Sequence, residues 1–107
     1  MVFHADDVVR LWLIDRMAAF IVERYLAGWS PAEVAALVAR IEHESIRFTS
    51  CNVTHLNTIT IPSDETCLCL FEADTLEAVV SANAALDLPA DRVVPVNVAH
   101  DSSADRS

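Results

Sequence analysis

Residues 54–73 read THLNTITIPSDETCLCLFEA and carry the clearest structural pattern in the chain. The first eight positions alternate and are rich in Thr and Ile, and the last eight alternate around Cys, Leu and Phe. Alternating β-branched and aromatic residues are typical of strands, and the intervening PSDE is typical of a turn. The pattern predicts two antiparallel strands, residues 53–61 and 66–73, joined in a hairpin by a four-residue loop.

The segments on either side of this hairpin each pair a strand with a helix. AFIVERYL predicts a strand at residues 19–26, and SPAE at residues 30–33 predicts a capped helix that continues to about residue 47. After the hairpin, DTLE at residues 74–77 predicts a second capped helix, and residues 92–98 predict a fourth strand. Pro95 indicates that this last strand lies at a sheet edge or is bulged, because proline cannot donate to a sheet ladder.

The predicted element order, βαββαβ, is that of the ferredoxin-like fold. We therefore expect an α+β domain at residues 17–99, with a four-stranded antiparallel sheet and two helices on one face. Residues 1–16 contain apolar side chains without helical or strand spacing, and we interpret them as an N-terminal extension. Residues 100–107 are small, polar and charged, which predicts a disordered tail.

The composition predicts a partner for the sheet face that the helices leave open. The chain of 107 residues suits one domain, and it is 53% hydrophobic with a mean hydropathy of +0.34. So apolar a small chain is expected to keep apolar residues on its open face, and a second copy is the simplest cover. The prediction is a homodimer in which two sheets pack face to face as a dimeric α/β barrel.

The charge and the cysteines restrict the partners and the setting. The formal net charge is −9, and the seven basic residues are all Arg, scattered singly along the chain. This distribution argues against nucleic acid and anionic membrane surfaces, and no run approaches the ~18–20 apolar residues of a transmembrane helix. The three cysteines do not make a disulfide framework, which predicts a reduced, cytoplasmic setting.

Strand alternation predicts which polar side chains lie together on the open face. If Ile61 pairs with Thr66 across the loop, counting back places His55 opposite Glu72. Glu23 of the first strand is expected on the same face. Imidazole nitrogen and carboxylate oxygen suit a borderline divalent cation, so we predict a metal site made by His55, Glu72 and Glu23.

Other interpretations of these residues remain open at this stage. His55 and Glu72 could form a cross-strand pair without a ligand, or a general base oriented by a carboxylate. Cys67 and Cys69 could be soft metal ligands, although buried small apolar residues are the simpler interpretation. The chain contains no Gly-rich phosphate loop, no GxSxG and no HExxH motif.

Three segments carry a family resemblance: FIVERYLAG at residues 20–28, PSDETCLCLFEA at residues 62–73 and LDLPADRVV at residues 86–94. They resemble the small bacterial nickel-binding protein family, a group of short ferredoxin-like domains. The resemblance covers residues 18–98. It implies a ferredoxin-like homodimer that takes up nickel or a similar ion.

The function predicted from the sequence is that of a small dimeric binding protein, with nickel or another divalent cation held on the open sheet face. Two alternatives belong to other classes. One is a self-associating interaction module without a ligand. The other is a small dimeric α/β-barrel enzyme that acts on an apolar small molecule, with His55 as its base. No catalytic residue is assigned, and an enzyme is the less favoured interpretation.

Overall fold

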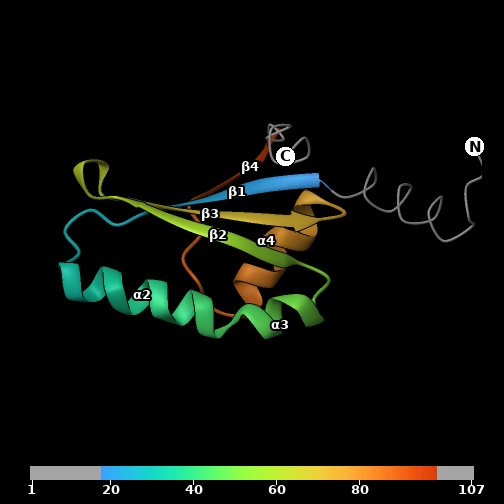
Figure 1. The fold of residues 1–107 in the computed structure, drawn as a ribbon, viewed down its shortest axis with the longest axis horizontal. Helices are drawn as coiled ribbons and strands as arrows, with labels where there is room; N and C mark the ends of the chain where they lie inside the picture. Colours follow the sequence, from blue (N-terminus) through green and yellow to red (C-terminus); the bar gives the residue numbers. More distant parts are fainter. Residues whose placement is uncertain (1–17, 99–107) are drawn as a thin grey trace, which may run out of the picture.

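The computed structural model describes residues 18–98 of the chain. The predicted extension, residues 1–16, and the predicted tail, residues 100–107, lie outside the described residues. The elements are β1 (Ala18–Tyr25), α2 (Pro31–His43), α3 (Ser45–Ser50), β2 (Thr54–Ile61), a 3₁₀ turn at Pro62–Asp64, β3 (Thr66–Ala73), α4 (Leu76–Ala85) and β4 (Arg92–Val96) (Figure 1). The predicted element order is therefore confirmed, except that the first helix is divided in two at Glu44.

The four strands form one antiparallel sheet in the order β2-β3-β1-β4, as the ferredoxin-like fold requires. Helices α2, α3 and α4 all lie on one side of this sheet (Figure 1). β4 pairs only with β1, so Pro95 stands in an edge strand as predicted. The other side of the sheet is left uncovered by the described helices.

Local signals explain where the first helix begins. Ser30 accepts a hydrogen bond from the backbone of Glu33, and the Glu33 carboxylate accepts one from the backbone of Ser30, which completes the predicted capping box. Gly28 in the preceding turn has a φ of 81°, a left-handed conformation that glycine adopts without strain. After the division at Glu44, α3 buries Phe48, whose ring centroid lies 4.8 Å from that of Phe71.

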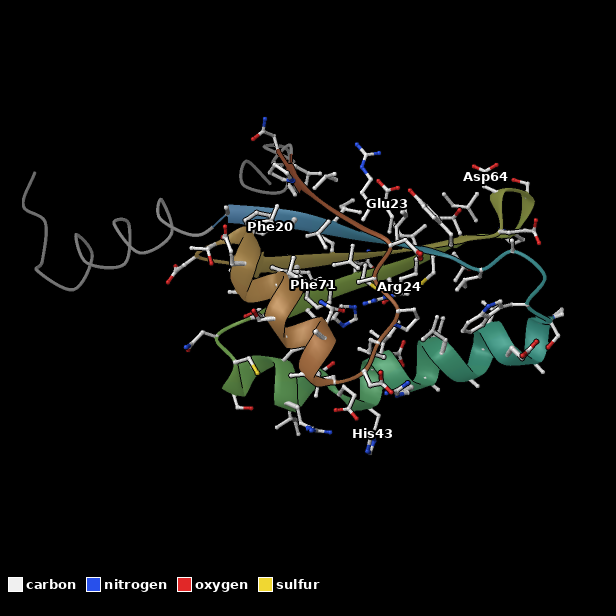
Figure 2. All side chains as sticks on the ribbon, turned by 180° about the vertical axis from the view of Figure 1, so that it is seen from behind. Phe20, Glu23, Arg24, His43, Asp64 and Phe71 are labelled. Atoms are coloured by element: carbon white, nitrogen blue, oxygen red, sulfur yellow. The ribbon has the colours of Figure 1, made fainter. Side chains whose placement is uncertain are left out.

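The core lies between the sheet and the helices. On β3 the residues at positions 67, 69, 71 and 73 are buried, and on β1 those at positions 20, 22 and 24 are buried. Val22, Phe71 and both strand cysteines therefore face the helices. Figure 2 shows Phe71 and Arg24 between the sheet and the helical layer, and Glu23 on the opposite side of β1.

The capping box yields a test of local stability. Ser30→Ala removes the oxygen that accepts from the Glu33 backbone, so the free energy of unfolding should fall by about 1 kcal/mol. Urea denaturation followed by circular dichroism measures it. The matched control is Ser81→Ala at an exposed position of α4, where alanine should leave stability unchanged or slightly raise it. Equal losses in both variants would contradict a stabilising role for the cap.

Candidate functional site

The centre of the uncovered sheet face is apolar. Register places side chains from all four strands on it in rows, with Val94, Ile21 and Leu70 side by side in the central row. The apolar members of this face, called the open face below, are Ala19, Ile21, Ile59, Leu68, Leu70, Val94 and Val96. Ile59 alone is 49% exposed, and the others are half-buried by their neighbours in the sheet. Acidic groups interrupt this surface at two places.

His55 does not lie on the open face, and that prediction is wrong. The predicted register holds from Ile61 opposite Thr66 back to Asn57 opposite Leu70. A β-bulge between His55 and Asn57 then adds one residue to β2, so His55 lies opposite Phe71 and Thr54 lies opposite Glu72. One extra residue exchanges the faces of a strand, and it turns His55 toward the helices.

The surroundings of His55 are those of a packed side chain. Its Nε2 lies 2.8 Å from Thr58 Oγ1 and 3.1 Å from the carbonyl oxygen of Asn57. Its ring centroid lies 5.2 Å from that of Phe71 and 6.4 Å from that of Phe48. Because Glu72 points to the opposite face, neither the predicted three-residue ligand set nor a His55–Glu72 acid–base pair is assembled within one chain.

Glu23 lies on the open face, as predicted, and it has partners. The Tyr25 hydroxyl donates a hydrogen bond to Glu23 Oε1 over 2.7 Å, and Arg92 Nη1 lies 3.6 Å from Glu23 Oε2. The hydrogen bond to Glu23, with smaller contributions from desolvation and from the carboxylate charge, raises the pKa of Tyr25 above its ordinary value. These three residues form a polar cluster beside the apolar rows.

Glu72 is the second acidic group on this face, also as predicted. It is half-buried, and the register places it beside Ala19, which in turn pairs with Val96. No hydrogen bond or ion pair joins its carboxylate to another of the described residues. Within residues 18–98, no three His, Cys, Asp or Glu side chains lie close enough together to hold a metal ion. A single chain therefore offers carboxylates on this face but no complete metal site in its described part.

A cleft of about 610 Å³ separates α2 from the hairpin on the helical side of the sheet. The predictions from sequence missed it, although the small residues Ala35 and Ala39, four apart on α2, were a signal of open space beside the helix. Trp29, 39% exposed, contributes to its wall. Its apolar lining consists of Leu26, Trp29, Pro31, Val34, Ala35, Val38, Ala39, Ile61 and Pro62. Its ionisable lining residues are Glu42 and Glu65.

Comparisons with known proteins agree with this architecture. Residues 20–96 match the model of a family described as nickel responsive protein SCO4226-like. The fold is similar to the crystal structure of SCO4226 from Streptomyces coelicolor A3(2), with a TM-score of 0.61 and 19% sequence identity over 78% of this chain and 100% of that chain. No curated protein matches the chain. Among residues 18–98, no helix is long and apolar enough to cross a membrane.

The Glu23 cluster can be tested through Tyr25, the single tyrosine of the chain. Its phenol should ionise above its ordinary pKa of about 10 in an ultraviolet difference titration. Glu23→Ala should lower this pKa, because it removes both the acceptor and the negative charge. Arg92→Ala should raise it further, because the nearby guanidinium favours the phenolate. A Tyr25 pKa that is the same in all three proteins would contradict the cluster.

Proposed function

Because the chain belongs to the SCO4226-like family of nickel responsive proteins, we propose that it is a small homodimeric binding protein that holds nickel or a similar divalent cation at its open face. The observation that carries this proposal is the open face itself, an apolar surface interrupted by the carboxylate of Glu72. The proposed ligands are Glu72 and Glu23, and Glu23 also forms the ion pair with Arg92. His55 is not among them.

Dimerisation is supported by the composition of the open face. Antiparallel sheets bury one face against a core and usually keep the other polar. Here the central row, Val94, Ile21 and Leu70, is apolar across three strands. A contiguous apolar surface of this kind marks an interaction site, and a two-fold axis would bring the same patch of each copy together.

Cation binding is supported by what dimerisation does to Glu72. A face that packs on itself brings the acidic groups of both copies toward one interface. A half-buried carboxylate without a cationic partner in the described residues disfavours that approach through repulsion and desolvation. A divalent cation removes this cost by binding carboxylate oxygens from both copies. Residues 18–98 of a single chain bring no group of three ligands together for it. The ion and the second copy would then depend on each other.

The dimer is tested by introducing a charged side chain into the apolar centre of the open face. Leu70→Lys places an ammonium group in the central row, so the variant should be a monomer, whereas the wild-type protein should be a dimer. Light scattering after gel filtration measures both masses. Val80→Lys is the matched control, because Val80 is an exposed apolar residue on α4, away from this face. A monomeric wild-type protein, or a dimeric Leu70→Lys variant, would contradict face-to-face packing.

The metal site is tested by equilibrium dialysis against nickel, using protein purified without a chelator or a nickel column. Glu72→Gln should reduce nickel affinity at least about tenfold, equivalent to roughly 1.4 kcal/mol. Glu77→Gln makes the same charge change at an exposed position of α4 and should bind nickel as tightly as the wild-type protein.

His55→Gln distinguishes the two faces of the sheet in the same experiment. It should retain nickel, since His55 packs beneath the helices. Nickel binding that is lost in His55→Gln but kept in Glu72→Gln would move the site to the helical side. A dimer with no nickel uptake would favour the interaction module without a ligand.

A further inference from the structure

The cleft between α2 and the hairpin takes no part in the proposed dimer or the proposed nickel site. It lies on the helical side of the sheet, opposite the open face, and its volume is about 610 Å³. This volume is within the range of roughly 300–1,000 Å³ that is typical of small-molecule sites. On β2, Thr60 pairs with the buried Cys67 and therefore faces the helices, yet Thr60 is exposed. α2 thus leaves this end of the sheet accessible to a ligand.

Both sides of the cleft are apolar. The helix contributes two valines and two alanines, Val34, Val38, Ala35 and Ala39, and the hairpin contributes Ile61. The two alanines are exposed, so their small side chains leave room beside the helix. A ligand with an apolar body is stabilised here, because its burial removes apolar surface of both partners from water.

The ionisable residues that line the cleft are both acidic, Glu42 from α2 and Glu65 from the hairpin. Glu42 lies in the last turn of α2, where the helix dipole adds negative potential. Arg40 of the same helix donates to two carbonyl oxygens that follow α4, and it does not line the cleft. Figure 2 shows His43 on the side of α2 that points away from the sheet. The cleft therefore favours a cation over an anion, as does the formal net charge of −9.

Hydrogen bonds fix Glu65 and the loop that carries Trp29 at one end of the cleft. The Gly28 N–H donates to Glu65 Oε2 over 2.9 Å, and the Leu26 N–H donates to the Glu65 carbonyl oxygen over 2.7 Å. The Trp29 N–H donates to the carbonyl oxygen of Leu26 over 3.0 Å. A carboxylate has two acceptor oxygens, so Glu65 Oε1 can still accept from a ligand. An indole ring and a carboxylate that line one cleft suit an organic ammonium group.

We propose that the cleft is a binding site for a small organic cation, an amine with an apolar body. The body packs between α2 and the hairpin, and the ammonium group binds at the acidic lining, with Glu65 as its principal partner. This site lies on the opposite side of the sheet from Glu72. It depends neither on the dimer nor on nickel binding.

The preference for a cation is tested with three probes of similar shape: phenylbutylamine, which is a cation, phenylbutanol, which is neutral, and phenylbutyrate, which is an anion. Equilibrium dialysis against the full wild-type chain should rank their affinities in that order. The amine should bind at least about threefold more tightly than the alcohol, as expected for a partly exposed ion pair. An amine that binds no better than the alcohol, or that shows no saturable binding, would overturn the proposal.

The role of Glu65 is tested in the same experiment. Glu65→Gln keeps an acceptor for the Gly28 N–H and removes the negative charge, so the amine should lose most of its advantage over the alcohol. Glu77→Gln is the matched control, because it makes the same charge change at an exposed position of α4 and should leave all three affinities unchanged. An equal loss in both variants would reduce the effect to net charge and contradict a bound ammonium group at Glu65.

The location of the site is tested with Ala35→Leu and Ala36→Leu. Both alanines are exposed on α2, but only Ala35 lines the cleft. Ala35→Leu should fill the cleft and abolish saturable binding of phenylbutylamine, whereas Ala36→Leu should bind it as the wild-type protein does. In a Trp12→Phe background, Trp29 is the single tryptophan, and its fluorescence should change as the amine saturates the protein.

Two results would place the amine elsewhere or give the cleft another occupant. Equal affinity of the two leucine variants for the amine would show that the cleft does not hold it. A change in mass by light scattering for Ala35→Leu alone would assign the cleft to a second copy of the chain. Either result would overturn the proposal.

Discussion

The antiparallel pairing of β1 with β3 is the constraint on which the rest of the molecule depends. Ala18 lies opposite Ala73 and Tyr25 opposite Thr66, with no irregularity between them. Because side chains alternate along both strands, this register assigns every residue of the two central strands to one of two environments. Large apolar groups and both strand cysteines lie under the helices, and a second apolar set lies on the open face. A slip of one residue would exchange these sets and expose the core.

The same division determines how each charged group of the sheet is accommodated. Glu23, at the margin of the open face, has a tyrosine hydroxyl and a guanidinium as partners. Glu72 lies on the same face among apolar neighbours and has no partner in the described residues. Arg24, one position from Glu23 along β1, points the other way and is buried beside two thiols. Adjacent residues of one strand thus meet opposite electrostatic environments, one on the open face and one inside the core.

Much of the fold could be predicted because its signals are local. The hairpin loop, the capping box at Ser30, the edge position of Pro95 and the burial of Phe71 all follow from neighbouring residues. The position of His55 did not follow, because a β-bulge between His55 and Asn57 leaves no distinct signal in a run of Thr, Leu and Ile. The bulge lets His55 stack near Phe48 and Phe71, contacts that join three separate elements.

Periodicity and turn chemistry along the chain were sufficient to establish the ferredoxin-like order of elements and the strand faces of Glu23 and Glu72. These properties depend on backbone geometry that repeats every two residues, or every three to four, so one sequence reveals them. Three features were decided only by tertiary packing: the inward turn of His55, the burial of Arg24 without a carboxylate partner among residues 18–98, and the cleft beside α2. Each arises where elements distant in the sequence meet, and the contacts that stabilise it exist only after the chain has folded.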